Sequence, residues 1–251
     1  MSLAMWLAAP CIGLVLTMFA AGGGMIAVPL LTFGVGLPLK EAIATSLIIV
    51  ACVSAVALLQ NKRWKLISWQ LHRFFGSGGM IGGFAGASFG LKISDDVQTI
   101  VFALLVFLIA WLMNSGLMKE QLELADGKLC NCRYVFLAGV VAGTVTAMLG
   151  VGGGFLIVPL LLMLGVDSYQ SAVAHSLIMI VSSSLVAVLR YAESLSIAWQ
   201  PSLVILVLAL LGTWLGNFLL DRYSTQRLQK GFSLMLCIMA AWMIWKTFSA
   251  I

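Results

Sequence analysis

The stretch AGGGMIAVPLL at residues 21–31 occurs again, little changed, as VGGGFLIVPLL at residues 151–161. The two copies lie 130 residues apart, from position 21 to position 151. Each places three consecutive glycines between apolar segments, and a proline follows after four further residues. Glycine costs about 1 kcal/mol relative to alanine inside a helix, so a run of three breaks a helix. The doubled motif therefore predicts two helical units, each interrupted near its start.

The same shift of 130 residues aligns the chain with itself downstream of the glycine motifs. The matching segments are EAIATSLI (41–48) with SAVAHSLI (171–178), ISWQ (67–70) with IAWQ (197–200), and Gly82 and Gly86 with Gly212 and Gly216. Self-similarity at one fixed spacing along most of the chain indicates a duplication. We therefore expect a first repeat at 1–118, a polar linker at 119–133 and a second repeat at 134–251.

The composition predicts that both repeats lie in a membrane. Of the 251 residues, 62% are hydrophobic and 9% are charged, whereas about 25% are charged in soluble proteins. Apolar runs of about 17–25 residues cross a bilayer as helices, because a helix satisfies its backbone hydrogen bonds internally. The apolar runs are 3–21, 42–59, 74–91, 97–113, 134–149, 172–189, 202–220 and 231–245. The expected fold class is an all-α polytopic membrane protein.

The basic residues indicate how the two repeats are oriented. Segment 60–73 of the first repeat is rich in Lys and Arg, while its equivalent, 190–203, has Arg190 alone. In the next loop the bias reverses, with Lys92 alone in the first repeat and several basic residues at 222–230 in the second. Since Lys and Arg concentrate in cytoplasmic loops, opposite loading favours inverted repeats. Inversion requires an odd number of crossings, about five in each repeat.

The fifth crossing in each repeat is expected to be the short segment after the glycines, 25–39 and 155–168. Each would be about 22 Å long as a helix, which is short for a full crossing. The alternative is a parallel arrangement with four spans in each repeat and a re-entrant segment after the glycines. The inverted arrangement places both chain termini outside, with 60–70, 222–230 and the linker in the cytoplasm.

The glycine triplets are the first part of the candidate binding site. They comprise Gly22, Gly23 and Gly24 in the first repeat and Gly152, Gly153 and Gly154 in the second. A helix that starts at membrane depth presents free N–H groups at the positive end of its dipole, which attract an anion. Inverted repeats bring both breaks towards one point, as in several transporter folds. Close helix packing is the alternative. Alanine at Gly23 or Gly153 adds only a methyl group, so at least one of these two variants is expected to melt near the wild type.

Thr45, Ser46, His175 and Ser176 form the second part of the candidate site, at equivalent positions in the two repeats. Hydroxyls of this kind often bond only to a carbonyl of their own helix. His175 differs, because an ionisable side chain inside an apolar span is costly and is by default a functional candidate. We expect it to contact the ligand or to couple transport to protons, with a structural histidine as the alternative.

Several other functions are not supported by the sequence. Every acidic residue lies in a loop or at a span end, which argues against a metal-cation carrier. Cys130 and Cys132 have no histidine neighbours at metal-ligand spacing, so we expect neither a metal nor a cofactor. No motif of an ATPase, metalloprotease or esterase occurs, so an enzyme is not expected. The net charge of +5 comes from residues at span ends and does not indicate nucleic acid binding. His72, beside Arg73, is expected at the membrane interface.

Both copies of the motif GGG-x4-P-L-L, each followed by A-[TH]-S-L and then by W-Q, resemble the sulfite exporter TauE/SafE family. The resemblance covers essentially the whole chain. It implies a secondary transporter of the bacterial cytoplasmic membrane that moves a small sulfur-containing anion, sulfite or an organosulfonate, by alternating access. The departure from the family is His175, where a threonine is more usual, as at Thr45 here.

Two other functions remain open at this stage. A passive anion channel is the nearest alternative. A membrane-embedded enzyme is the more distant one, and it would need His175 to face a serine. The lipid bilayer and a second copy of the chain, in a homodimer, are the other expected partners.

Overall fold

The computed structural model describes residues 3–19, 23–60, 63–114, 132–166, 168–195 and 199–220, and all regular structure among them is helical. The helices are α1 (Leu3–Phe19), α2 (Gly23–Pro29), the π-helix η1 (Leu30–Val35), α3 (Leu39–Gln60), the 3-10 helix η2 (Arg63–Leu66), α4 (Trp69–Lys92), α5 (Asp95–Asn114), α7 (Cys132–Leu149), α8 (Gly154–Met163), α9 (Tyr169–Ala192) and α10 (Trp199–Leu220). They lie where the apolar runs predict them. The run 231–245 lies outside the described residues.

In the described part of the chain, many large apolar side chains are exposed and many hydroxyl groups are buried. Large apolar residues are exposed along α4, α5, α7 and α10, among them Phe84 (52%), Phe107 (54%) and Trp214 (72%). The buried residues include Thr17, Ser54 and several other hydroxyl-bearing side chains. Apolar surface on this scale is stable against lipid chains and not against water.

Three helices in the described part of the chain are long and apolar enough to cross a membrane, namely Leu39–Gln60, Cys132–Leu149 and Tyr169–Ala192. Two shorter apolar helices, Gly24–Val35 and Leu203–Gly216, accompany them. The segment expected at 155–168 is shorter as a helix than predicted, since α8 ends at Met163. Its 10 residues extend for about 15 Å. The number of spans remains a prediction.

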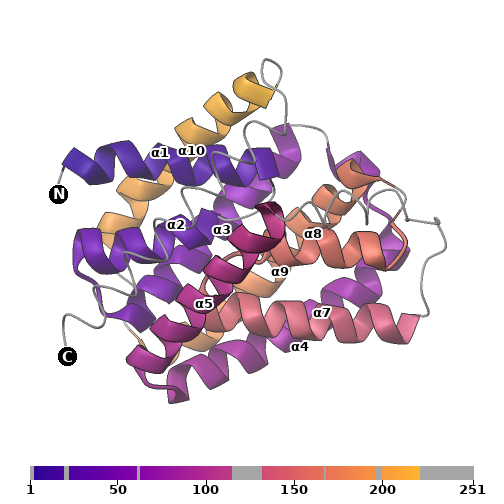
Figure 1. Cartoon of the computed structure of the whole chain (residues 1–251), viewed down its shortest axis with the longest axis horizontal. Coiled ribbons are helices and arrows are strands. Elements are labelled where there is room, and N and C mark those ends of the chain that lie inside the picture. The colour runs from indigo at the N-terminus through magenta and orange to yellow at the C-terminus, as the bar shows by residue number, and fades with distance from the viewer. Residues whose placement is uncertain are drawn as a thin grey trace.

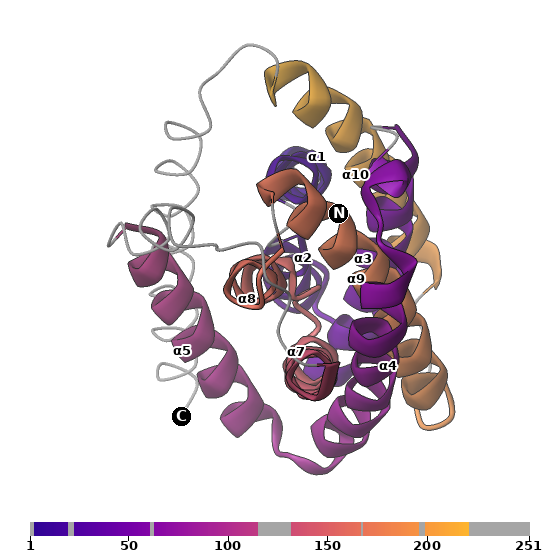
Figure 2. The ribbon, with the colours of Figure 1, turned by 90° about the vertical axis from the view of Figure 1, so that its right-hand side faces the viewer.

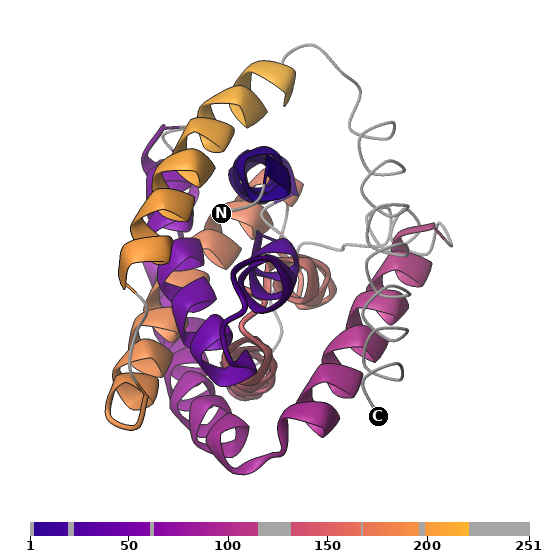
Figure 3. The same cartoon turned by 90° about the vertical axis from the view of Figure 1, so that its left-hand side faces the viewer.

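The interrupted segments occupy the middle of the molecule. Figures 2 and 3 show α1, α2, α7 and α8 between α4, α9 and α10 on one side and α5 on the other. The most extensive helix contacts join α4 with α7 and α1 with α10 (Figure 1). Each of these pairs combines one helix from each expected repeat.

Glycines bring the backbones of α4 and α7 together. A side chain at Gly82 would meet the carbonyl oxygen of Val140, and one at Gly86 the carbonyl oxygen of Thr144. Small residues allow such close approach between membrane helices. The residue numbers rise together along both helices, so α4 and α7 run parallel.

The pair α1–α10 has the same geometry. A side chain at Gly212 would meet the carbonyl oxygen of Pro10, and one at Gly216 that of Leu14. In the 130-residue shift, Gly212 is equivalent to Gly82, and Val140 is equivalent to Pro10. The contact between α1 and α10 is therefore the same as that between α4 and α7, with the two repeats exchanged. The helices α1 and α10 are therefore also parallel.

Helix α9 packs against both α3 and α4. Gly79 faces the side chain of Met179 and Gly83 faces the carbonyl of Ser183, so α4 and α9 run parallel. Relative to α3, helix α9 runs in the opposite direction. Ser171, near the start of α9, donates to the carbonyl of Leu66, just beyond the end of α3 (3.3 Å). The helices α3 and α9, which occupy equivalent positions in the sequence, are therefore antiparallel.

Replacing Gly82 with alanine is expected to destabilise the protein, because the methyl group would collide with the backbone carbonyl of Val140. The expected cost is about 1–3 kcal/mol, measured as a lower temperature of thermal unfolding in detergent. Gly212→Ala is expected to behave in the same way, since Gly212 faces the carbonyl of Pro10. The control Ile81→Ala alters a neighbouring side chain that is 56% exposed. Unchanged melting of both glycine variants would contradict this packing.

Candidate functional site

The two glycine breaks are in direct contact. A side chain at Gly24, in the first turn of α2, would overlap the carbonyl groups of Gly150 and Val151, which follow α7. The two backbone segments therefore touch without a side chain between them at this point. Gly22 lies outside the described residues, and Gly23 is described only as the first residue of α2.

The second break consists of left-handed backbone. The angle φ is 69° at Gly150, 76° at Gly152 and 56° at Gly153, and residues with a side chain adopt such values at a cost of about 1–2 kcal/mol. Gly154 then donates its N–H to the carbonyl of Gly152 (2.7 Å) as α8 begins. The turn itself thus requires glycine, and in this conformation the N–H of Gly154 is occupied within the break.

Ser46 connects the first repeat to the second break. Its hydroxyl oxygen lies 2.8 Å from the carbonyl of Ile43 and 2.8 Å from the carbonyl of Gly150. A hydroxyl has one proton and donates it to one acceptor at a time. The side chain is fully buried, and Gly150 belongs to the segment that contacts Gly24. Ser46 therefore lies at the contact between the two breaks.

Thr146 is a polar residue of this region that sequence reasoning missed. Its carbonyl accepts the N–H of Gly150 at 2.9 Å, but its buried hydroxyl has no hydrogen-bond partner. The hydroxyl lies against Gly153, where a side chain would otherwise be. The equivalent residue of the first repeat is Leu16, so a search for matching polar positions could not find Thr146. The feature of the sequence that could have identified Thr146 is its hydroxyl, one helical turn before a glycine break.

The remaining hydroxyls of the candidate site, on Thr45 and Ser176, are fully buried. The hydroxyl of Thr45 has no hydrogen-bond partner. Ser176 donates to the carbonyl of Val173 at 2.8 Å, a bond within its own helix. Thr45 thus retains its hydrogen-bonding capacity, whereas that of Ser176 is partly used by α9.

The described contacts of His175 are with the start of α4. Its Nε2 accepts the backbone N–H of Ser68 at 3.1 Å, while its buried Nδ1 has no partner. His72, in the first turn of α4, lies within electrostatic reach of this imidazole and also has a buried Nδ1 without a partner. The ring of His72 is half-buried, and its expected place at the membrane interface stays a prediction. Sequence reasoning missed the pair because its members belong to different repeats.

Helices with apolar exteriors, buried hydroxyls and two interrupted segments in contact define a polytopic α-helical membrane protein. The chain belongs to the sulfite exporter TauE/SafE family, whose model matches residues 5–243. It is therefore a membrane transporter, and it lies in the bacterial cytoplasmic membrane as a multi-pass protein.

Similar proteins extend over most of the chain. A probable membrane transporter protein of Xylella fastidiosa (strain Temecula1) is 29% identical over 245 residues, which cover 96% of this chain and 94% of the relative. The probable membrane transporter protein YdhB of Bacillus subtilis is 25% identical over 216 residues, covering 85% and 86%. The probable membrane transporter protein MJ0441 of Methanocaldococcus jannaschii is 26% identical over 161 residues, covering 61% and 58%. No solved structure matches the chain.

Alanine at Gly153 is expected to destabilise the protein, although the sequence alone did not require a large loss of stability at this position. The residue has a φ of 56°, and the hydroxyl of Thr146 occupies the position of the added methyl. The expected loss is about 1–3 kcal/mol. Thr146→Ala removes a hydroxyl without a partner, so it is expected to cost less and to recover part of the loss in the double variant.

Thermal unfolding of the wild type, the two single variants and the double variant gives the coupling energy between the two positions. If the two residues are in contact, the double variant is expected to lose less free energy of unfolding than the two single variants lose together. Strictly additive effects would contradict the contact between Thr146 and Gly153.

Proposed function

We propose that the protein is a secondary transporter that moves a small anion, sulfite or an organosulfonate, by alternating access around the contact between the two glycine breaks. The contact of Gly24 with Gly150 and Val151 is the observation that carries the proposal. Irregular backbone inside a membrane is tolerated only where protein buries it or where it lines a cavity. The family to which the chain belongs is described as a sulfite exporter, and this description supports the substrate class.

In this proposal, backbone N–H groups of the two triplets, at 22–24 and 152–154, bind the anion together with the hydroxyls of Thr45 and Ser46. Sulfur oxyanions present several oxygen atoms that accept such hydrogen bonds. The carbonyl groups of Gly150 and Val151 fill the space beside Gly24 in the present conformation, so an anion enters only when the breaks separate. The hydroxyl of Ser46 then donates its proton to the anion in place of the Gly150 carbonyl. The anion thus has a hydrogen bond that exists only in the open state.

His175 and Ser176 supply the equivalent contacts from the second repeat. Ser176 corresponds to Ser46 in the alignment of the repeats, and the residue that corresponds to Gly150 is Ala20, which lies outside the described residues. The imidazole of His175 adds an ionisable group to the second repeat. Its described Nε2 contact is a backbone N–H and not a serine hydroxyl, which does not favour the enzyme alternative.

We further propose that the repeats, about five crossings each, are inverted. The helices α3 and α9, which are equivalent in the two repeats, are antiparallel. In the same alignment α4 is equivalent to α10 and α7 to α1, and the pairs α4–α7 and α1–α10 are both parallel. A two-fold axis in the membrane plane relates pairs of this kind. Since α7 and α9 both run parallel to α4, the chain must return between them, and α8 makes this return. The segments before α4, α7 and α9 then share the side that the basic residues assign to the cytoplasm.

Purified protein in liposomes is expected to take up at least one of sulfite, sulfate, thiosulfate and sulfoacetate at a rate that saturates with concentration. Unlabelled anion on the inner side is expected to accelerate uptake of the labelled anion, because a transporter returns faster when loaded. A passive channel would show a rate that rises linearly and does not respond to the inner anion. Absence of flux for all of these anions, with folded protein in the liposomes, would contradict the proposal.

The variant for the same assay is His175→Thr, which gives the second repeat the residue found at Thr45. Imidazole is the side chain that ordinarily changes charge between pH 5 and 8. The variant is expected to fold normally but to change the pH dependence of transport or the order of preferred anions. If both are unchanged, His175 is a structural residue and has no part in coupling.

A further inference from the structure

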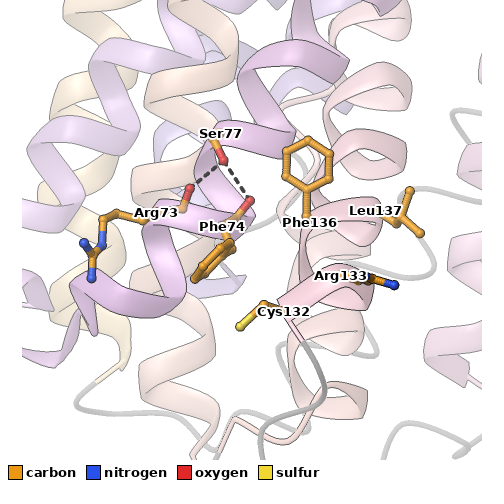
Figure 4. Close-up of a pocket in the computed structure, with 7 residues that line it drawn as sticks. All are labelled: Arg73, Phe74, Ser77, Cys132, Arg133, Phe136 and Leu137. Carbon is orange, nitrogen blue, oxygen red and sulfur yellow. Dashed lines mark hydrogen bonds between the residues drawn. The ribbon is translucent and has the colours of Figure 1, made fainter.

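A groove of about 650 Å³ lies on the outer surface between the starts of α4 and α7 (Figure 4). Its lining residues are Arg73, Phe74 and Ser77 of α4 and Cys132, Arg133, Phe136 and Leu137 of α7. None of these residues belongs to the site at the glycine breaks. Because α4 and α7 come from different repeats, a ligand in this groove bridges the two repeats.

The walls of the groove are apolar and accessible. The side chains of Phe74 and Leu137 are 40% and 57% exposed, and Phe136 lies between them in Figure 4. The hydroxyl of Ser77 contacts the carbonyls of Arg73 and Phe74 in its own helix, so its proton is already donated. These walls therefore suit hydrocarbon better than a soluble polar ligand.

The rim of the groove is cationic. The exposed side chains of Arg73 and Arg133 extend from either side of it, in opposite directions in Figure 4. The ion pairs found among the described residues join other side chains, Lys40 with Asp95 and Arg190 with Glu193. A guanidinium group binds phosphate with two parallel hydrogen bonds. Cationic rim and apolar walls together match an amphiphile with an anionic head.

Aromatic side chains place the rim at the depth of the lipid headgroups. Trp69 lies one helical turn before Arg73 and is 64% exposed, and Tyr134 follows Arg133 and is 65% exposed. Exposed Trp and Tyr concentrate at the membrane–water interface. The groove therefore begins among the headgroups and continues along α4 and α7 towards the hydrocarbon. Basic pockets between membrane helices on the cytoplasmic side bind anionic lipid headgroups.

We propose that this groove binds an anionic phospholipid, with its headgroup at the cationic rim that Arg73 and Arg133 form and an acyl chain along Phe74, Phe136 and Leu137. The lipid holds the starts of α4 and α7 together from outside, at the end of the glycine contact between them. This site is independent of the transported anion. The competing occupant is the linker, whose acidic residues Glu120, Glu123 and Asp126 precede α7 in the sequence.

The first test measures thermal unfolding of the detergent-purified full chain with added dioleoyl phosphatidylglycerol or dioleoyl phosphatidylcholine. Phosphatidylglycerol is expected to raise the melting temperature of the wild type, and the Arg73→Gln/Arg133→Gln variant is expected to need at least tenfold more of it for the same shift. Lys92→Gln, an exposed lysine at the other end of α4, is the control and keeps the wild-type response. Equal stabilisation by both lipids, or an unaltered response in the double arginine variant, would overturn the proposal.

The second test uses the wild-type lining and does not depend on the folding of the arginine variant. The thiol of Cys132 is exposed in the groove, and its labelling by a maleimide is followed by peptide mass spectrometry in nanodiscs. Nanodiscs containing phosphatidylglycerol are expected to slow labelling at least about threefold relative to pure phosphatidylcholine, as for a site occupied most of the time. Equal rates would overturn the proposal.

Two further arms of the labelling experiment distinguish other occupants. Protection by inorganic phosphate equal to that by phosphatidylglycerol would identify a soluble-anion site and reject the lipid. Labelling could instead be faster in the variant Glu120→Gln/Glu123→Gln/Asp126→Asn and unaffected by phosphatidylglycerol. That result would identify the linker as the occupant and would also reject the lipid. The lipid predicts protection by phosphatidylglycerol alone, at the same rate in the linker variant.

Discussion

Backbone groups that leave a helix inside a bilayer must find partners within the protein, because the hydrocarbon contains no water to bind them. The structure meets this constraint by placing the two glycine breaks against one another. The carbonyl of Gly150 accepts the hydroxyl proton of Ser46, and the missing side chain of Gly24 leaves room for that carbonyl. The first repeat thus supplies both a hydrogen-bond donor and the space that the second break needs. A contact of this kind is stable when closed and leaves several hydrogen-bonding groups for a ligand when opened.

The long helices hold the breaks in the middle of the molecule. The pairs α4–α7 and α1–α10 each join the two repeats through backbone contacts at glycines such as Gly82 and Gly212. Backbone atoms cannot rotate away as a long side chain can, so these pairs are suited to move as rigid units. Rigid pairs around a central contact that carries few side chains are the mechanical basis of the alternating access proposed above. The groove at the start of α4 and α7 places a lipid at the outer edge of one such pair.

Hydropathy and self-similarity are properties of the chain itself, and for this reason the helices and the positions of the two glycine breaks could be predicted. Contacts between repeats could not. The bond from Ser46 to Gly150 and the proximity of His72 to His175 depend on which helices are neighbours. The conformation of Gly153 was also inaccessible, because three glycines are compatible with a helix start or with left-handed backbone. Thr146 was missed since the first repeat has no hydroxyl at the equivalent position.

The central claim is that the contact between the two breaks lies on the transport path. Ser46→Cys, in a variant without other cysteines, tests it by reaction with a small membrane-impermeant anionic thiol reagent added to either face of the membrane in separate experiments. Ser46 is fully buried in the present conformation, so reaction requires the breaks to open. Alternating access predicts modification from each face. Modification from neither face, or from one face only, would contradict the account.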